Sequence, residues 1–399
     1  MRLLFLTPQW PYPPRQGTAI RNWGLISHLA RRHTVSVLTF GPAEDRPKPL
    51  VSICERVEAV APPTRSLIQR MTDLALGRAD LARRLWSPSF RAALEAWLQR
   101  DRFDGVQIEG LELAPYLATI QAHHLPVVYD AHNAEHVIQR RALTTDRGRS
   151  GRRLAALYSS IQLPRLRALE RTTLRAVDGV CAVSAEDAEA LRVVAPGSAP
   201  VIVPNGIDLQ AYTPTAPIGT SPGRVVFTGK MDYRPNVDAV LWFVGEIWPH
   251  IRAGRPEASF WIVGQSLTAA VQALDGRDGV HVTGAVEDTR PYIAGAQVYV
   301  APLRMGGGTR FKLLEAFALK RPVVSTRVGA EGFPVHAGRE ALLADTPLAF
   351  AEAVGSVLAD PALGERLAAM GRALVAERYD WAVIVPALES LWRALVDRP

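Results

Sequence analysis

The feature that most constrains the fold of this chain is a regular alternation of short apolar runs with longer segments of helical periodicity. Helical spacing is clear at residues 20–32, where the apolar side chains recur on one face. Strands that alternate with helices predict a parallel sheet that helices cover on both faces. In the N-terminal half of the chain, residues 67–100 are predicted to be helical. Strands are predicted there at residues 2–7, 34–39, 105–108, 127–130, 179–183 and 201–203.

A second series of the same kind begins after a loop rich in proline and glycine, which runs from Asn205-Gly206 to Gly223. Here we predict strands at residues 225–229, 259–264, 280–283, 297–301 and 322–325, with a helix at 237–251. The chain from residue 348 onward is predicted to be mostly helical, and its last helix is predicted at 381–396.

A chain of 399 residues is long enough for two domains with separate cores. We therefore predict an α/β fold with two doubly wound, Rossmann-like domains. The N-terminal domain is expected to cover residues 1–204 and to be completed by a returning segment at 379–399. The C-terminal domain is expected to cover residues 205–378. In such a tandem, the carboxyl ends of the strands are expected to face an interdomain cleft, where ligands bind.

The strongest candidate for a binding site is the stretch 304–316, which follows a predicted strand, contains three glycines in a row and opens a predicted helix. Glycines let the backbone approach closely, and the free N–H groups of a first helical turn point toward a bound anion. Thr309 is a candidate cap of that helix, and Arg310 adds a positive charge. Glu315 follows inside the helix, where its carboxylate suits the vicinal hydroxyls of a ribose. The alternative is an ordinary glycine loop, with Glu315 facing solvent.

Polar loops follow other predicted strands as well. Gly17, after the first strand, is a candidate phosphate ligand through its backbone N–H. Residues 129–136 form a polar cluster at a strand end, a position typical of a site. In this cluster His132 is our candidate to contact the substrate, and His136 is predicted to be structural. No third ligand for a zinc ion lies nearby in the sequence, so we expect no metal.

In the second domain, Lys230 follows the first predicted strand, where a phosphate could meet its charge. Asn236, in the same loop, is predicted to cap the helix that follows. A further strand-to-helix turn, with Thr283, Gly284 and Val286, is predicted to hydrogen-bond a base through its backbone.

The formal net charge of +7 and the pI near 9.7 point to an anionic partner. Ten arginines lie between residues 140 and 175, against only two acidic residues. A surface that docks on anionic lipid is one expectation for them, and solvated helix faces are the alternative. Two cysteines imply no disulfide framework, and Pro8 ends the first apolar run too early for a signal peptide. We expect a cytoplasmic protein that docks at the inner face of the membrane.

Taken together, these segments resemble the retaining nucleotide-sugar glycosyltransferases of the GT-B fold, in the large family 4 group. Within that group, the chain is similar to bacterial sugar transferases of cell-envelope and exopolysaccharide gene clusters. The resemblance covers nearly the whole chain and is most specific at residues 304–326. It is also carried by residues 8–14, 129–133, 203–208 and 229–236.

The resemblance implies a hexosyltransferase that moves a sugar from a nucleoside diphosphate sugar to a glycan or lipid-linked acceptor, with retention at the anomeric carbon. It also implies that no metal or other cofactor is needed. The implied ligands of the donor are Glu315 for the ribose and residues 283–286 for the base, and His132 would contact the sugar or the acceptor. The diphosphate would be held by Gly17, Lys230 and the backbone of Gly308 and Thr309.

The chain departs from the family pattern at two positions. Gly307 stands where the family has the first of two paired glutamates, which changes the expected contact to the transferred sugar. Pro235 replaces a second basic residue after Lys230, and Arg234 or Arg310 is expected to compensate.

Two alternatives to sugar transfer remain open. One is a non-catalytic GT-B-like binding or scaffold protein, which the glycine at position 307 favours. The other is a nucleotide-sugar epimerase. No nucleic-acid partner is expected, because the basic residues lack interleaved aromatic residues.

Overall fold

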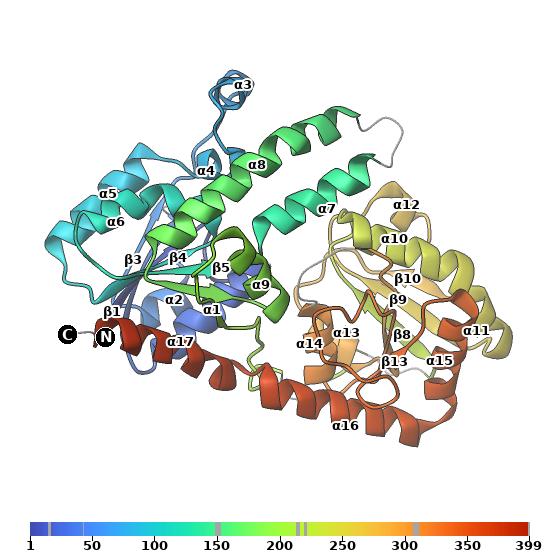
Figure 1. The fold of residues 1–399 in the computed structure, drawn as a ribbon. Coiled ribbons are helices and arrows are strands. Elements are labelled where there is room, and N and C mark those ends of the chain that lie inside the picture. Colours follow the sequence, from blue (N-terminus) through green and yellow to red (C-terminus); the bar gives the residue numbers. More distant parts are fainter. Residues whose placement is uncertain are drawn as a thin grey trace. The chain divides into compact units, whose positions relative to one another are not determined.

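A computed structural model of the protein describes residues 1–14, 17–42, 44–147, 153–212, 216–218, 222–305 and 311–397. The chain divides into two compact units (Figure 1). The first unit comprises Met1–Asn205 together with Ile384–Pro399, and the second comprises Gly206–Val383. The long final helix α17 (Trp381–Val396) therefore begins in the second unit and ends in the first.

The first unit is built on a parallel sheet of seven strands in the order β3-β2-β1-β4-β5-β6-β7. These strands are β1 (Arg2–Thr7), β2 (Thr34–Phe40), β3 (Arg56–Val60), β4 (Gly105–Glu109), β5 (Val127–Ala131), β6 (Gly179–Ala182) and β7 (Val201–Ile202). The helices of the unit are α1 (Gly17–Leu29), α2 (Lys48–Ile53), α3 (Leu67–Ala75), α4 (Asp80–Arg84), α5 (Pro88–Arg100), the 3-10 helix η1 (Leu111–Tyr116), α6 (Leu117–Gln121), α7 (Glu135–Arg147), α8 (Arg153–Ala176) and α9 (Ala185–Val194).

The second unit repeats the plan with six parallel strands in the order β10-β9-β8-β11-β12-β13. These strands are β8 (Arg224–Thr228), β9 (Ser259–Val263), β10 (Val280–Val282), β11 (Val298–Ala301), β12 (Val323–Ser325) and β13 (Leu342–Leu343). Its helices are α10 (Arg234–Trp242), the π-helical segment η2 (Phe243–Ile247), α11 (Trp248–Gly254), α12 (Ala269–Gln272), α13 (Arg290–Ala294), α14 (Phe311–Ala318), α15 (Pro347–Ala359) and α16 (Pro361–Arg378).

In both sheets the first strand of the unit lies in the middle, and the strand order reverses beside it. A reversal of this kind leaves a crevice at the carboxyl ends of the two neighbouring strands, because their helices leave on opposite faces. The pairs in question are β1 with β4 in the first unit and β8 with β11 in the second. The predicted fold class, two doubly wound Rossmann-like domains, is confirmed.

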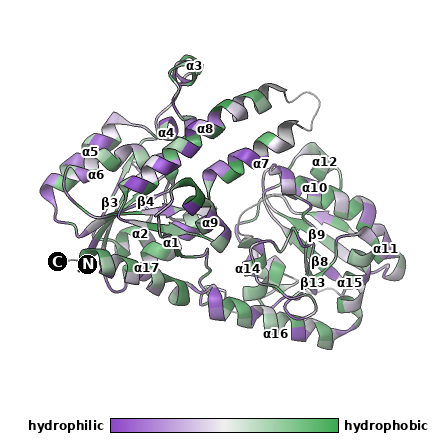
Figure 2. Ribbon diagram, in the orientation of Figure 1, coloured by the Kyte–Doolittle hydropathy of each residue, from purple (hydrophilic) through white to green (hydrophobic). Residues whose placement is uncertain are grey.

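The central strands are almost wholly apolar because helices cover both of their faces. In β1 the side chains from Leu3 to Leu6 are fully buried, and in β8 the same holds from Val225 to Phe227. Figure 2 shows the strands β8 and β9 as mainly hydrophobic, whereas the surrounding helices alternate between hydrophobic and hydrophilic residues. Each unit therefore has its own core.

Several predicted elements differ in detail from the observed ones. Residues 67–100 form three helices, α3, α4 and α5, because Gly77 takes a left-handed conformation at φ 74° and Pro88 starts a new helix. The predicted helix at 237–251 begins earlier, at Arg234, and contains the π-helical segment η2. Strands β3 and β13 were not predicted.

The position of α14 depends on close packing against α16. A Cβ atom at Gly371 of α16 would overlap the ring of Phe317 on α14, whereas a Cβ at Gly355 of α15 would enter open space. We expect Gly371→Ala to lower the free energy of unfolding by about 1–3 kcal/mol, because an extra methyl overpacks the contact.

Gly355→Ala is the matched control, since both glycines are helical and lie in the same unit. It should be neutral or stabilise by up to about 1 kcal/mol, because alanine favours the helix. Urea unfolding of both variants measures the difference. If Gly371→Ala and Gly355→Ala have the same free energy of unfolding, the close approach of α14 and α16 is contradicted.

Candidate functional site

In the first unit, charged side chains gather at the carboxyl ends of β4 and β5, next to helix α1. Arg21 of α1 is only 1% exposed and makes a two-pronged ion pair with Asp130 of β5, which is fully buried. Its Nε and Nη2 atoms lie 2.7 Å and 2.6 Å from the two carboxylate oxygens. Its Nη1 donates to the carbonyl of Pro204 and to the side chain of Asn205. Such complete pairing is what a buried charge requires.

His132, which follows β5, contacts a second buried carboxylate in this group. Its Nε2 atom lies 2.9 Å from Oε2 of Glu109 at the end of β4 and 3.7 Å from Oδ2 of Asp130. The amide nitrogen of Asn22, when turned toward Glu109, lies 2.8 Å from the same Oε2. The structure thus places the predicted site residue His132 against two buried carboxylates, Asp130 on the strand that it follows and Glu109 on the neighbouring strand.

The protonation of His132 and Glu109 is set by opposing effects. Burial, together with the charge of Asp130, raises the pKa of Glu109 to about 7. Burial alone would lower the pKa of His132. The hydrogen bond to Glu109 and the charge of Asp130 outweigh this effect, so the pKa of His132 is raised. Glu109 is consequently able to exchange a proton near neutral pH, and the protonated form of His132 is favoured relative to a free imidazole.

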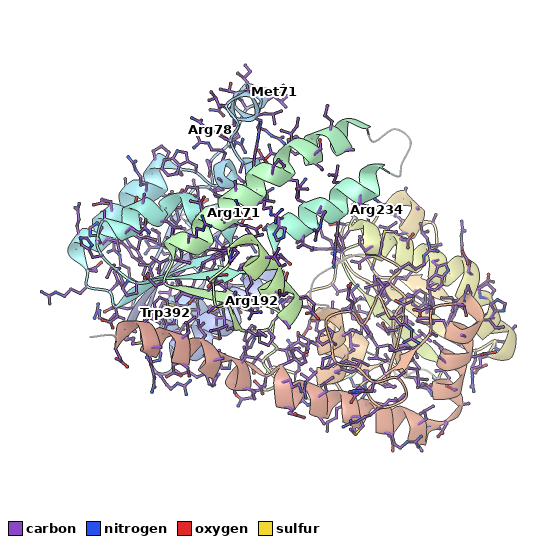
Figure 3. The ribbon with its side chains drawn as sticks, viewed as in Figure 1. Met71, Arg78, Arg171, Arg192, Arg234 and Trp392 are labelled. Atoms are coloured by element: carbon purple, nitrogen blue, oxygen red, sulfur yellow. The ribbon has the colours of Figure 1, made fainter. Side chains whose placement is uncertain are left out.

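Helix α17 reaches this pair through two hydrogen bonds. The indole N–H of Trp392 donates to Oε1 of Gln107 at 3.0 Å, and Nε2 of Gln107 donates to Oε1 of Glu109 at 2.6 Å. Figure 3 shows Trp392 on α17. Gln107 and Glu109 lie on the same face of β4 as Gly105, where a Cβ would overlap the indole ring of Trp392. Glycine at position 105 therefore lets Trp392 approach the strand.

Glu109, Asp130 and His132 also form the kind of group that can hold a metal ion, since their ligand atoms all lie within 4.8 Å of one another. The sequence showed no third zinc ligand near His132 and His136, whereas the structure brings Glu109 beside His132 from another strand. Both oxygens of Asp130 accept hydrogen bonds from Arg21, however, and both oxygens of Glu109 have donors as well. A buried guanidinium also repels a dication. These residues therefore fit an ion-pair network better than a metal site.

His136 has a structural environment, as predicted. Its Nδ1 lies 2.7 Å from the buried carboxylate of Glu170 on α8. The same carboxylate accepts the backbone N–H groups of Glu135 and His136, in the first turn of α7. Glu170 thus caps α7 and orients the segment that carries His132.

In the second unit, the predicted residues Lys230, Arg234 and Asn236 lie in the loop and helix that follow β8. Lys230 is exposed, and its Nζ lies 3.1 Å from Asp232. Arg234 is the first residue of α10 and is labelled in Figure 3. Asn236 is not the helix cap that was predicted, because α10 already begins at Arg234. Its side chain instead donates to the carbonyl of Lys230 at 3.0 Å and accepts from Nζ of Lys312 at 2.7 Å.

Glu315 of α14, in the same unit, contacts the side chain of Tyr212. The Tyr212 hydroxyl donates to Oε1 of Glu315 at 2.9 Å. Burial raises the pKa of Glu315, while this hydrogen bond and the charge of Lys312 act in the opposite direction. The side chain of Glu315 is therefore half-buried and hydrogen-bonded to Tyr212. It does not have the solvent-facing position that the alternative prediction gave it.

The predicted base-binding turn follows β10. The backbone N–H of Thr283 donates to the carbonyl of Ile262 in β9, and Gly284 has a left-handed conformation at φ 70°. Val286 packs against the apolar core of the unit. In the first unit, Gly17 is the first residue of α1. The predicted ligands Gly307, Gly308, Thr309 and Arg310 lie outside the described residues.

Several residues of these two groups were missed by the sequence analysis. Gln107 lies within the strand predicted at 105–108, Glu109 directly follows it, and polar side chains at such positions of a buried strand were a usable signal. Lys312 stands three residues before Glu315, a spacing that puts both on one helix face. For Arg21 and Tyr212 the sequence offers no comparable signal, since their partners are 109 and 103 residues away.

Models of two glycosyltransferase families match the chain in succession. Glycosyltransferase Family 4 matches residues 16–211, and Glycosyl transferases group 1 matches residues 222–360. The chain belongs to the family 4-like glycosyltransferases. It is 29% identical over 212 residues to the phosphatidyl-myo-inositol mannosyltransferase of Mycobacterium tuberculosis. This alignment covers 50% of the chain and 55% of that protein, so the chain spans about half the length of the curated relatives it matches.

Solved structures of glycosyltransferases share the fold over its whole length. Sucrose-phosphate synthase from Thermosynechococcus elongatus aligns with a TM-score of 0.72 and 18% identity, covering 100% of both chains. Anabaena Alr3699/HepE in complex with UDP aligns with a TM-score of 0.69 and 15% identity, covering 99% of this chain and 100% of the other. These similarities establish the GT-B fold, and the two family matches confirm the family resemblance seen in the sequence.

The contact between Glu109 and His132 makes a prediction about titration. In Glu109→Gln the side chain keeps its shape but loses its charge, so His132 loses the main interaction that raises its pKa. We expect the pKa of His132 to fall, so that the imidazole loses its proton at a lower pH than in the wild type. Titration of the imidazole ¹⁵N resonances by NMR measures it, with His132→Gln to assign the signal.

Glu95→Gln is the matched control for this titration. Glu95 also contacts a histidine, His123, at 3.1 Å, but it belongs to a different part of the unit. This variant should leave the pKa of His132 unchanged. If Glu109→Gln also leaves this pKa unchanged, the carboxylate of Glu109 does not control the pKa of the His132 imidazole.

Proposed function

We propose that the chain transfers a hexosyl group from a nucleoside diphosphate sugar to a glycan or lipid-linked acceptor, with retention of the anomeric configuration. The observation that carries the proposal is the half-buried carboxylate of Glu315, which is hydrogen-bonded to Tyr212 and lies within the influence of two cations, Lys312 of α14 and Arg290 of α13. A carboxylate next to cations suits a ribose joined to a diphosphate. The family match over both halves of the chain supports the same reaction.

In this reaction, the bond between the anomeric carbon and the diphosphate oxygen breaks, and the electron pair stays on the leaving diphosphate. A bond from the same carbon to the acceptor oxygen forms on the same face of the sugar. The proton of the acceptor hydroxyl passes to the leaving phosphate oxygen. No metal is needed in this scheme, because cationic side chains and backbone N–H groups stabilise the leaving charge. His132 would donate a hydrogen bond to the sugar or to the acceptor.

The donor is best identified with a panel of UDP-, GDP- and ADP-sugars in a thermal-shift assay, since a saturating ligand raises the unfolding temperature by mass action. Release of free sugar from the stabilising donor then tests for catalysis. A non-catalytic binding protein would be stabilised without releasing sugar. An epimerase would convert the donor into its isomer without releasing the sugar.

We expect His132→Ala to lower the rate of donor hydrolysis by about a hundredfold or more, the effect typical of losing one group that stabilises a transition state. Hydrolysis is followed by release of the nucleoside diphosphate. His250→Ala is the control, because His250 is an exposed histidine of α11. A His132→Ala variant that retains the wild-type rate would remove His132 from the site.

We also propose that the first unit docks on an anionic membrane at the cytoplasmic side, where a lipid-linked acceptor is presented. Exposed arginines on α7 and α8 support this, among them Arg140, Arg141, Arg167, Arg171 and Arg175. Among the residues that the structure describes, no helix is both long and apolar enough to cross a membrane. Docking would therefore be peripheral.

The helix α3 adds an apolar element to this surface. Its side chains Leu67, Ile68 and Met71 are exposed by 76%, 78% and 63%, whereas its Asp73 is buried. Figure 3 labels Met71 on this helix, together with the neighbouring Arg78. Ser66 and Gln69 form a capping box, so the helix is stabilised without burial of its apolar face. An apolar face flanked by arginines suits the interface of an anionic bilayer.

We expect the protein to co-sediment with vesicles that contain anionic lipid, to be released by salt, and not to bind neutral vesicles. The double substitution Ile68→Asp, Met71→Asp should abolish binding, because charged side chains resist insertion. Leu348→Asp is the control, since Leu348 is 57% exposed on the second unit. Absence of binding to anionic vesicles at low salt would contradict the proposal.

A further inference from the structure

The side chain of Lys312 lies at the carboxyl end of β8, although its residue belongs to α14. Its Nζ atom is 4.1 Å from the centre of the ring of Phe227, which belongs to β8. A Cβ atom built at Gly229, the residue after the strand, would lie 3.3 Å from the same Nζ. The ammonium group is thus beside the backbone at the strand end, together with the amide of Asn236, at the place where ligands bind in a doubly wound sheet.

Lys312 also joins the helix to the loop that contains Lys230. Asn236 accepts from Nζ of Lys312 and donates to the carbonyl of Lys230, so one amide holds both segments together. The ammonium of Lys230 itself is 56% exposed and paired with Asp232. Of these two lysines, Lys312 is therefore the one whose charge is fixed at the end of the sheet.

Lys312 and Glu315 are spaced three residues apart on α14, and residues at this spacing are neighbours on one helix face. In a nucleoside diphosphate, the first phosphate is joined to the ribose through its 5′ carbon. A cation one helical turn from a carboxylate consequently matches the order of the two groups in the ligand. The charge of Lys312 acts on Glu315, so the two side chains are close enough to interact.

We infer that Lys312 binds the diphosphate of the donor and neutralises it as the leaving group, while Glu315 on the same helix receives the ribose. This inference rests on the proposed function and identifies the Lys312 ammonium as a group that binds the donor. When the bond between the anomeric carbon and oxygen breaks, the electron pair remains on the diphosphate, and the ammonium stabilises that charge. Lys312 thereby supplies the second cation whose usual position is taken by Pro235.

A purely structural role for Lys312 makes a different prediction. If Lys312 only ties α14 to the 229–236 loop, then breaking the tie at Asn236 should have the same effect as removing the ammonium. Asn236→Ala removes the amide and leaves the charge in place. Lys312→Met removes the charge and keeps an unbranched side chain of similar length, and Lys312→Arg keeps the charge.

Calorimetry with UDP, GDP and ADP, and with the matching nucleosides uridine, guanosine and adenosine, separates these roles. We expect Lys312→Met to weaken binding of the preferred diphosphate by about ten- to a hundredfold, as for loss of a charged hydrogen bond. Binding of the matching nucleoside should be unchanged. Lys312→Arg should retain most of the affinity for the diphosphate, and Asn236→Ala should lose less than Lys312→Met.

The inference is overturned if Lys312→Met binds the diphosphate like the wild type, or if Asn236→Ala reproduces its full loss. It is also overturned if Lys312→Met weakens binding of the diphosphate and binding of the nucleoside by the same factor. Thermal unfolding shows whether each variant is folded, and Lys312→Gln replaces Lys312→Met if that variant is not. A wild-type protein that binds none of the three diphosphates would overturn the proposed donor as well, which distinguishes the two failures.

Discussion

The ion pair between Arg21 and Asp130 is the interaction on which the first unit's site depends. It buries a full guanidinium between α1 and β5, and its cost in desolvation is offset only because every oxygen and nitrogen of the pair has a partner. With Asp130 committed to Arg21, its pKa is lowered, against the effect of burial. Glu109, which has no guanidinium partner of this kind, is the carboxylate left to share a proton with His132.

The second unit uses charge differently at the corresponding end of its sheet. Its cations are Lys230, in the loop after β8, and Lys312, on α14. Its carboxylate, Glu315, contacts a hydroxyl instead of a guanidinium. Burial raises the pKa of Glu315, and the hydrogen bond from Tyr212 and the charge of Lys312 oppose this effect without cancelling it. One fold thus presents a closed ionic network in one unit and a carboxylate hydrogen-bonded to a neutral hydroxyl in the other.

The sequence was sufficient for the fold because buried parallel strands are apolar along their whole length. It failed for β3, where Arg56 and Glu58 alternate with apolar residues, since an edge strand is only half-buried. At the site, His132 and Glu315 could be predicted because each follows a strand end or a glycine-rich turn. Their pairing with Glu109 and Tyr212 could not be predicted, because these partners lie 23 and 103 residues away and meet them only in the folded units.

The end of the chain contributes to the chemistry of the first unit as well as to its packing. An indole N–H can only donate a hydrogen bond, so Trp392 turns the oxygen of the Gln107 amide toward itself. The amide nitrogen must then face Glu109, where it donates to the carboxylate. This arrangement favours the ionised form of Glu109 and opposes the effect of burial. Helix α17, which begins in the second unit, thereby helps to set the charge next to His132 in the first.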